Sequence, residues 1–562
     1  MPRLLRSTIL MAAAVAAGLA CYVGATLPPR TVTLDGAPSR QTVFGAYHIH
    51  TNRSDGSGTP DEIAAAAARS GLAFVIVTDH GDGTRPPDPP AYRHGVLYVD
   101  ALEINTLAGH LVALGLTAAA PYPLAGEAAD VIEDVHRLGG WAVVAHPDSP
   151  NPALQWRDWT VPYDGVEWLN ADSEWRGQTV SSLAGTALRA IVRSPESIAS
   201  LFRRPSRTLQ RWDDAIQYRP VVALAALDAH ARLPWPGSNE PRRRTILARP
   251  GYDSMFRTLQ QGVILDAPWS GDAPADASRL LQAIEGGRTF SIVRALAGPA
   301  ELQFVATQAG RWVVMGGRLP DMSPVHFHAA VPQAPGVELV LVQRNRALAR
   351  GKGSLDWAGG PSPGAYRVEV RFPGTDVPWL LSNPIYAGVP PLDAPAVAAP
   401  PATTAALALG ADRGWRAEHD AASRADVAAG PADVSLTFAL GAGPPAGQYA
   451  AVVTDVDGEE AFDAVQFTAR ADRPMRVSLQ VRLLSGQRWR RSVYVDGAAR
   501  SVVVHLDEFE RVETASVLRP NAARIRSVLF VVDTLNTTPG TRGSLTLSNV
   551  ALSRAPVVDA GK

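Results

Sequence analysis

Over residues 43–293, short runs of Val, Ile and Ala alternate with stretches of helical composition. Runs that are apolar on both faces are typical of parallel strands covered by helices, and they lie at 73–78, 141–145, 165–169 and 221–227. The stretch 59–70 opens with Thr-Pro-Asp-Glu, a favourable helix start, and the stretch 127–138 ends at two glycines. This alternation predicts an α/β barrel or a doubly wound sheet.

The chain carries no overall charge that would attract a polyanion. Its formal net charge is −1 over 562 residues, so composition indicates neither a nucleic-acid partner nor an anionic membrane surface. Its one cysteine excludes an internal disulfide framework and a cysteine-based metal site.

The N-terminus has the pattern of an export signal or an anchor. Arg3 and Arg6 precede an uncharged run over 8–27, and about 20 apolar residues just span a bilayer. The run is rich in Ala and Gly, and Val23-Gly24-Ala25 is a small-residue cleavage site. Residues 1–27 are therefore predicted as a signal peptide or anchor, or alternatively as a buried helix of the fold. The body is expected to be extracytoplasmic, periplasmic or secreted, with membrane contact only through this segment.

After about residue 300 the helical stretches give way to short β-like runs separated by Gly/Pro turns. Residues 299–392 are predicted as a small β-sandwich and 393–409 as a Pro/Ala-rich linker. Residues 410–555 are predicted as a second, galactose-binding-like β-sandwich. Arg482, Trp489, Tyr494 and Asp533 could line a glycan site there, or simply pack and solvate the sandwich.

Histidines and carboxylates stand where the predicted strands begin or end. Tyr47-His-Ile-His50 comes first, and on an extended strand its histidines share one face, about 7 Å apart. Such a pair alone is as often a surface or core feature. The wider set is His48, His50, Asp55, His80, Glu103, His110, His146, Asp228 and His230.

Polar groups at strand ends converge on one mouth of a parallel barrel, where sites on that architecture lie. Six histidines with three carboxylates in this arrangement are hard to assign to packing, so the sequence predicts a metal site. His326 and His328 repeat the pattern without evident partners and are interpreted as structural. Asp79 is expected to orient a ligand or to cap the strand end, and His94 and His136 lie outside the pattern.

These residues resemble the ordered motifs of the PHP (polymerase and histidinol phosphatase) family over about 43–230. The motifs are His48-x-His50-Thr-x-x-Ser-Asp55-Gly, Thr78-Asp-His80, Glu103, Gly109-His110, Ala145-His146-Pro and Asp228-x-His230. The N-terminal signal and Leu381-Ser-Asn-Pro-Ile-Tyr386 also resemble the CehA/McbA branch.

The resemblance implies a distorted (β/α)7 barrel over 43–298 with two to three divalent ions, Zn, Mn or Fe. It assigns one ion to His48, His50, Glu103 and Asp228. A second ion is assigned to Asp55, His80 and His230. Glu103 then bridges to a third ion, held by His110 and His146.

Clustered ions lower the pKa of a bridging water, which makes a hydroxide nucleophile available, and Asp228 could protonate the leaving group. Arg53 and Arg176 could bind a phosphate, although each could equally be a surface residue. The favoured function is a phosphoesterase acting on a small-molecule ester. The alternatives are a hydrolase of a non-phosphate ester, amide or carbamate, and a non-catalytic protein that binds glycan or the cell surface. Trp156, Trp159 and Trp175 could form an apolar wall at the mouth, which would favour an aryl or lipid-like substrate, or cover the rim.

Overall fold

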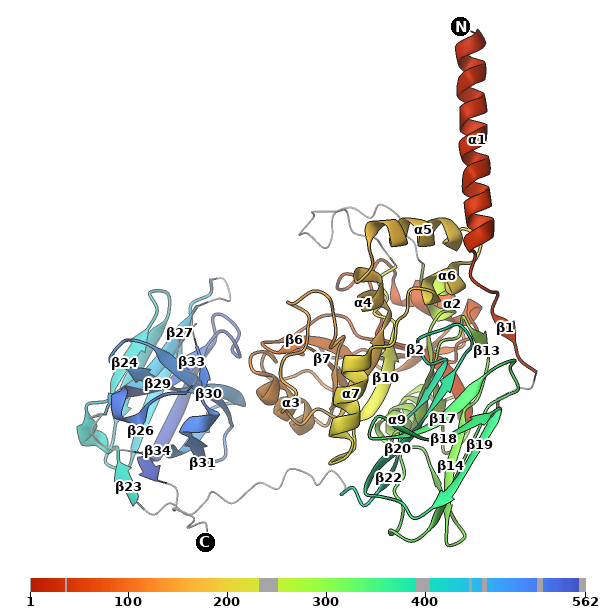
Figure 1. The fold of residues 1–562 in the computed structure, drawn as a ribbon. Coiled ribbons are helices and arrows are strands. Elements are labelled where there is room, and N and C mark those ends of the chain that lie inside the picture. The colour runs from red at the N-terminus through yellow and green to blue at the C-terminus, as the bar shows by residue number, and fades with distance from the viewer. Residues whose placement is uncertain are drawn as a thin grey trace. The chain divides into compact units, whose positions relative to one another are not determined.

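The protein is described by a computed structural model over residues 2–35, 38–231, 251–390, 405–443, 447–456, 462–512 and 519–554. The chain divides into two compact units (Figure 1). Unit 1 comprises Met1–Gly81, Pro86–Ala118 and Ile132–Leu392. Unit 2 comprises Asp82–Arg85, Ala119–Val131 and Asp393–Lys562.

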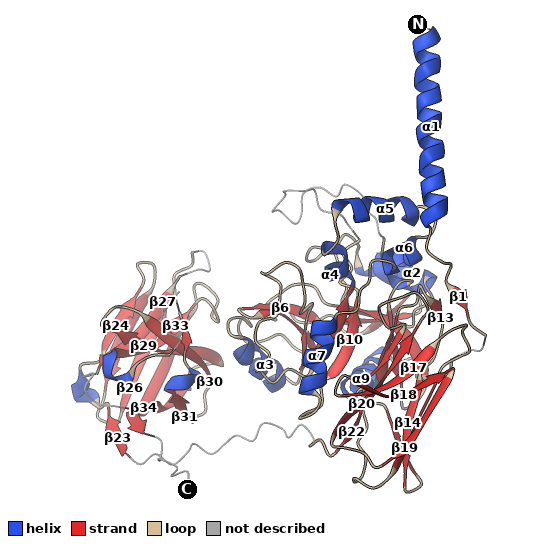
Figure 2. Cartoon of the chain, in the orientation of Figure 1, coloured by secondary structure: helices blue, strands red, loops and turns tan. Residues whose placement is uncertain are grey.

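Among the described residues, the α-helices lie within residues 2–285, and only short 3-10 turns follow them (Figure 2). They are α1 (Pro2–Thr26), α2 (Pro60–Arg69), α3 (Ala128–Arg137), α4 (Ala171–Arg176), α5 (Val180–Ala190), α6 (Ser194–Ala199), α7 (Ser206–Ala215), α8 (Tyr252–Phe256) and α9 (Ala273–Glu285). The two predicted helices are confirmed as α2 and α3. α2 begins with a capping box, in which Thr59 and Glu62 each accept the other's backbone N–H.

Seven strands of unit 1 follow one another around a ring. They are β2 (Thr42–Tyr47), β3 (Phe74–Val77), β6 (Leu102–Thr106), β7 (Gly109–Leu114), β8 (Trp141–Val144), β9 (Gly165–Asn170) and β10 (Val222–Ala226). β2 pairs with β3, and β6 to β10 form one sheet. Single bridges, His80–Glu103 and Ile49–Ala229, join these two groups at both ends. The predicted α/β character is confirmed, but β7 runs antiparallel to β6 and β8, so the expectation of parallel strands throughout is wrong.

The sheet that contains β2 and β3 extends well beyond the ring. Its other strands are β4 (Ala91–Arg93), β5 (Val96–Asp100), β11 (Gln260–Ile264), β12 (Thr289–Ile292), β17 (Glu338–Gln343), β18 (Arg346–Lys352), β20 (Gly364–Arg371), β21 (Leu380–Ser382) and β22 (Ile385–Ala387). β12 pairs with β21, so strands from 299–392 share a sheet with strands of the ring. The domain boundary at 298/299 stays a prediction.

A four-stranded sheet faces the extended part of that sheet across an apolar core. It comprises β14 (Gln303–Gln308), β15 (Arg311–Val314), β16 (Val325–Ala330) and β19 (Ser354–Gly359), while β1 (Val32–Thr33) pairs with β13 (Ala297–Gly298). Phe304, Phe327, Leu339 and Val368 belong to the shared core. Asn383 closes the junction, because its side-chain amide accepts from Ala223 N–H at 2.8 Å and donates to the Ala223 carbonyl at 3.0 Å.

Unit 2 contains two six-stranded antiparallel sheets, which confirms a sandwich-like β fold. Its strands are β23 (Ala405–Ala408), β24 (Arg416–His419), β25 (Arg424–Ala429), β26 (Asp433–Ala439), β27 (Tyr449–Asp455), β28 (Ala464–Ala471), β29 (Met475–Leu483), β30 (Arg488–Val495), β31 (Arg500–His505), β32 (Glu510–Arg511), β33 (Ile525–Asp533) and β34 (Arg542–Arg554). Phe467, Trp489, Phe530 and Leu545 lie in the core. The part of the predicted linker at 393–404 lies outside the described residues, and β23 follows it.

α1 is not a buried helix of the fold. Residues Arg6–Thr26 are long and apolar enough to cross a membrane, by length and composition. Ile9, Leu10 and Met11 are 59–71% exposed. The buried-helix alternative is therefore wrong, while the choice between a signal peptide and an anchor stays a prediction.

Candidate metal centre

Glu103 lies at the centre of the nine predicted ligands and is 1% exposed. Its Oε1 atom is 2.8 Å from His110 Nδ1 and 2.9 Å from His146 Nε2. Its Oε2 atom is 3.2–3.4 Å from ring nitrogens of three more histidines, His80, His50 and His48. One carboxylate on β6 thus faces five imidazoles that come from four other segments of the chain.

The two aspartates complete the cluster. Asp228 Oδ1 lies 3.2 Å from His50 Nε2, and Asp55 Oδ1 lies 3.2 Å from His230 Nε2. Eight of the nine residues form overlapping groups whose ligand atoms lie within 4.8 Å of one another: His48, His50 and Glu103; His50, Asp55 and His80; His50, Asp228 and His230; His80, Glu103 and His110. These groups could hold metal ions, and His146 joins them through Glu103.

The backbone at the cluster is locally strained. His48, His146 and Asp228 have φ values of 62°, 29° and 50°, in the left-handed region that residues other than glycine rarely adopt. β2 ends at Tyr47, so the predicted alternation of His48 and His50 on one strand is wrong. The left-handed turn at His48 instead brings the two Nε2 atoms to 3.2 Å.

Strand direction explains why the first residues of one strand meet the last residues of others. His110 is near the start of β7, whereas His80, His146 and Asp228 follow the ends of their strands. Because β7 is antiparallel to its neighbours, its start lies at their carboxyl-terminal edge.

Asp79 positions the loop that follows His50, as the sequence predicts. It accepts hydrogen bonds from the Thr51 N–H at 2.8 Å and from the Thr51 hydroxyl at 2.6 Å. These bonds link the end of β3 to the first residue after His50. They thereby hold the His50 imidazole, which Glu103 and Asp228 face.

Glu167 is a functional residue that the sequence reasoning missed. Its Oε1 atom lies 2.5 Å from His48 Nδ1, and its Oε2 atom accepts the His146 N–H at 2.8 Å. A proton on His48 Nδ1 leaves the Nε2 lone pair directed at the cluster, which is how outer carboxylates orient metal-binding histidines. The available signal was an acidic residue inside the apolar run 165–169.

The electrostatics of the cluster favour positive charge. Burial alone would lower the pKa of the His50 imidazole, but Asp228 and Glu103 outweigh it and raise that pKa to about 10. Burial likewise opposes ionisation of Glu103, yet the surrounding histidines, His48 first, hold its pKa well below the usual range. A site that binds protons this strongly also favours divalent cations, because metal ions and protons compete for the same lone pairs.

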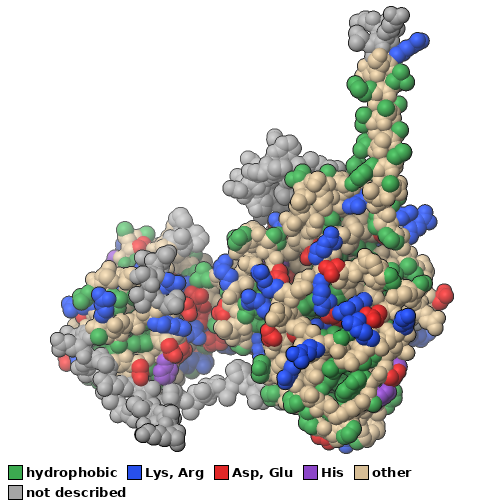
Figure 3. Space-filling view, in the orientation of Figure 1, with side chains coloured by type: hydrophobic (Ala, Val, Ile, Leu, Met, Phe, Trp, Pro, Cys, Tyr) green, Lys and Arg blue, Asp and Glu red, His purple; other side chains and the backbone are tan. Residues whose placement is uncertain are grey.

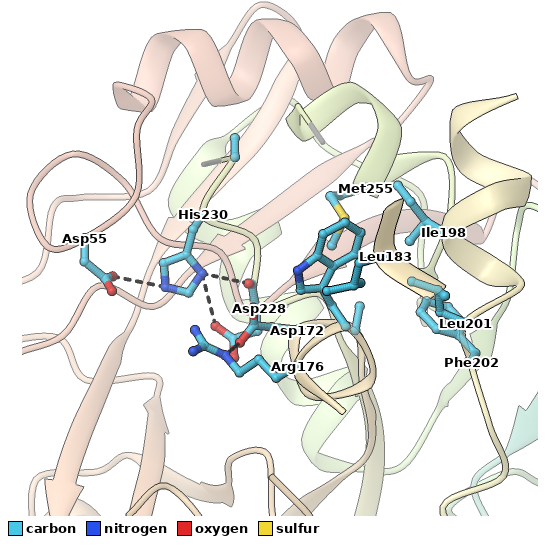
Figure 4. A pocket seen from close by; sticks show the side chains of 13 residues that line it. Asp55, Asp172, Arg176, Leu183, Ile198, Leu201, Phe202, Asp228, His230 and Met255 are labelled. Atoms are coloured by element: carbon cyan, nitrogen blue, oxygen red, sulfur yellow. Dashed lines mark hydrogen bonds and ion pairs between the residues drawn. The ribbon is translucent and has the colours of Figure 1, made fainter. Parts of the chain in front are cut away.

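A cavity of about 270 Å³ opens beside the cluster and has two chemically different sides. Figure 4 shows polar groups on one side and apolar groups on the other. The polar side comprises Asp55, Asp172, Arg176, Asp228 and His230, and the apolar side comprises Trp175, Leu183, Ile198, Leu201, Phe202 and Met255.

The two predicted phosphate-binding arginines differ in place. Arg176 lines the cavity and pairs with Asp172. Arg53 instead pairs with Asp88 at 2.5 Å. Of the three predicted tryptophans, Trp175 lines the cavity. Trp156 is 3% exposed, and Trp159 packs on the Tyr163 ring, so both match the alternative of a covered rim.

Histidines outside the cluster have partners of their own. His326 and His328 lie 3.0 Å and 2.9 Å from Asp356 Oδ1, because Asp356 on β19 is opposite His328 on β16. The expectation that this pair lacks partners is therefore wrong. His136 Nε2 lies 2.7 Å from Asp164, and His94 is exposed.

The four glycan-site candidates of unit 2 have separate roles. Trp489 is 0% exposed within the core and offers no ring face to a sugar, which matches the alternative that it packs the sandwich. Arg482 binds both carboxylate oxygens of Glu418, at 2.8 Å and 2.9 Å. Asp533 accepts the Leu535 N–H at 3.0 Å, and Tyr494 donates to Asp496 at 3.2 Å.

Comparison with known proteins finds a sequence likeness over a short stretch of the chain. A 3′,5′-nucleoside bisphosphate phosphatase of Chromobacterium violaceum is 33% identical over 85 residues, which are 14% of this chain. The match spans 30% of that phosphatase, under a third of its length. That relative is named as a phosphatase, and its likeness to this chain is distant. No family model matches the chain.

Solved structures with partial likeness include carbohydrate-binding proteins. The family 11 carbohydrate-binding module of a cellulosomal cellulase of Clostridium thermocellum is 14% identical, with 27% of this chain and 97% of that chain covered and a TM-score of 0.22. An exo-beta-agarase is 13% identical, with 26% and 24% covered and a TM-score of 0.19. Neither likeness is close enough to indicate a ligand.

Proposed function

We propose that this protein is a metal-dependent phosphoesterase of the PHP type. The observation that carries the proposal is that the nine predicted ligands form one cluster: eight belong to overlapping groups whose ligand atoms lie within 4.8 Å, and His146 contacts Glu103 directly. The ring of seven strands is compatible with a distorted (β/α)7 barrel. The phosphatase relative favours phosphate esters over other esters.

The donor set fits divalent transition metals. Imidazole nitrogens and carboxylate oxygens suit Zn²⁺, Mn²⁺ or Fe²⁺, and Glu167 orients His48 as metal-binding histidines require. We assign two to three ions, divided as the PHP resemblance implies, with both oxygens of Glu103 in use. The finer assignment to the CehA/McbA branch rests on the N-terminal signal and the Leu381-Ser-Asn-Pro-Ile-Tyr386 motif.

When bound, such ions supply a hydroxide nucleophile near neutral pH and offset charge on the phosphoryl group. Water adds at phosphorus, the bond from phosphorus to the leaving oxygen breaks, and the alcohol departs with a proton. Asp228 is poorly suited to donate that proton. Although burial opposes ionisation, the nearby His48 and His50 hold its pKa well below the usual range. Asp228 is instead assigned as a ligand, and Arg176 as a substrate-binding residue.

We place the body of the protein outside the cytoplasm, with α1 as its export signal or anchor. The apolar, exposed span of α1 supports this placement. A glycan ligand for unit 2 stays a prediction from sequence.

The test combines metal analysis with a panel of substrates. We expect two to three equivalents of transition metal per chain, and hydrolysis of p-nitrophenyl phosphate or bis-p-nitrophenyl phosphate. His50→Ala should remove metal and activity together, while His94→Asn, at an exposed histidine with φ 50°, should retain both. Turnover of aryl carboxyl or carbamate esters without phosphate esters would instead establish the non-phosphate hydrolase. Metal-replete protein that hydrolyses none of them would refute both enzyme functions.

A further inference from the structure

The outward face of α5 is apolar where a surface helix is normally polar. Val180 is 84% exposed, Ala184 and Ala187 are exposed, and Ile191 just after the helix is 74% exposed. Their spacing of four, three and four residues places them on one face of the helix. Val192 extends the patch and is 60% exposed. A continuous apolar stripe of this kind marks an interaction surface.

α1 identifies what covers this stripe. Its apolar side chains are exposed along the length of the helix (Figure 3), and the helix is long enough to cross a bilayer. α5 lies across the base of α1 (Figure 1) and contacts it. Arg189 donates to the Thr26 carbonyl at 3.5 Å, at the point where the candidate span ends.

The packing between the two helices is close. The Tyr22 hydroxyl lies 2.7 Å from the place where a Cβ atom on Gly185 would stand, so a larger residue there would displace the Tyr22 side chain. Arg193 donates to the Pro28 carbonyl just beyond the span. A bilayer that accommodates α1 therefore reaches its interface at the level of α5, and the apolar stripe lies where interfacial helices bury such faces.

A flank of α5, next to the stripe, contributes to the cavity beside the metal centre. Leu183 lines its apolar side together with Ile198, Leu201 and Phe202. Asp55, Asp228 and His230 line the polar side of the same cavity (Figure 4). One helix thus offers an apolar stripe to the outside and a wall to a cavity that is apolar at one end and polar at the other.

We propose that α5 rests on the membrane surface and that the substrate is a lipid phosphate, a phosphate monoester with a long hydrocarbon chain drawn from the bilayer. Its chain occupies the apolar side of the cavity, and its phosphate reaches the metal centre. This inference rests on the proposed phosphoesterase function and adds its substrate class. A small hydrophilic phosphate ester would leave the apolar side of the cavity unfilled.

The first test measures chain-length dependence in solution with the full-length, metal-loaded protein. We expect kcat/KM to rise from ethyl to butyl, hexyl and octyl phosphate, by up to about fourfold per methylene until the cavity is full. Leu183→Gln should lower the ratio of octyl to ethyl phosphate turnover about tenfold, because it places an amide against the chain. A flat series would overturn the lipid assignment and leave the phosphoesterase intact, whereas no turnover of any member, with turnover of carboxyl esters, would refute the phosphoesterase itself.

The second test addresses the membrane, with dodecyl phosphate in phosphatidylcholine vesicles. Val180→Asp with Ile191→Asp should lower turnover in vesicles, relative to octyl phosphate in solution, by about tenfold or more. The matched control is Trp312→Asp with Val314→Asp, at two exposed apolar residues of β15, 73% and 45% exposed, which should leave that ratio unchanged. Equal ratios in both double variants would overturn the docking of α5, even if the chain-length series holds. Both double variants keep α1, so membrane binding through α1 cannot account for a difference between their activity ratios.

Discussion

Two clusters of buried charge lie in unit 1, and they differ in how their charges are compensated. In the first, on β20, Arg367 is 1% exposed and donates to both carboxylate oxygens of Asp213 at 2.7 Å. Arg367 and Arg204 both donate to Glu369, at 2.6–2.8 Å. In the second, the metal centre, Glu103 and Asp228 face imidazole rings.

The difference separates a structural cluster from a binding site. Guanidinium groups carry a permanent positive charge, so the β20 cluster is complete without any further ion. The imidazoles of the candidate metal centre compensate its carboxylates only while they are protonated, so this compensation can be exchanged for bound cations. We therefore expect substitutions in the β20 cluster to lower stability, and substitutions in the metal centre to lower metal content and activity.

The largest effect is expected from Glu103→Gln. The substitution removes the carboxylate that faces five histidines, so we expect metal content to fall and activity to drop about 10,000-fold. Stability of the metal-free protein should change little, because the neighbouring imidazoles can release their protons when the carboxylate is lost. Metal analysis, kinetics and chemical denaturation check the three quantities. Retention of metal and activity would show that Glu103 is not the centre of the site.

The β20 cluster should show the converse. Glu369→Ala leaves Arg367 buried without one of its partners, so we expect the free energy of unfolding to fall by about 3–5 kcal/mol. The folded fraction should keep its metal. The matched control is Glu338→Ala, which breaks an exposed pair with Arg350 and should cost under about 1 kcal/mol. Equal losses in the two variants would contradict the structural role of the cluster.

Glu174 is half-buried and, among the described residues, forms no ion pair with a guanidinium group. The pH dependence of stability at this residue extends the comparison of the two clusters. Burial raises the pKa of Glu174 to about 7, whereas Arg204 and Arg367 outweigh burial and hold the pKa of Glu369 at about 2. Glu174 favours folding below its unfolded pKa of about 4.5, and this contribution is lost as pH rises towards 7. Glu174→Gln should therefore raise stability at pH 8 relative to pH 5 by about 1–3 kcal/mol, measured by urea denaturation. No change in that difference would show that Glu174 is not buried as a free acid.

The smallest effect separates the two predicted phosphate-binding arginines. Arg176 lines the cavity, so Arg176→Ala should raise KM for a phosphate ester about tenfold, while Arg53→Ala should change it under about threefold. Steady-state kinetics with p-nitrophenyl phosphate distinguishes them. An equal rise in KM for both variants would place the phosphate elsewhere than beside Arg176.

Much of the fold and the ligand set follows from local pattern. The apolar runs at 73–78 and 221–227 gave β3 and β10, because a strand covered on both faces needs continuous apolar residues. The antiparallel β7 escaped prediction, since its direction depends on pairing with β6 and β8 and not on its own residues. The two alternatives for Trp489, a glycan site or packing, stayed open for the same reason: the composition of β30 does not say which face the core covers.

The sequence by itself determined which side chains can bind metal, because histidines and carboxylates beside apolar strands have few other uses. Only the tertiary structure decided how they meet: the left-handed turn at His48, the position of Glu103, and the bond from Glu167 to His48 across 119 residues. It also placed α5 between the end of α1 and the cavity. These relations are distances between segments far apart in the chain, and local sequence pattern carries no information about them.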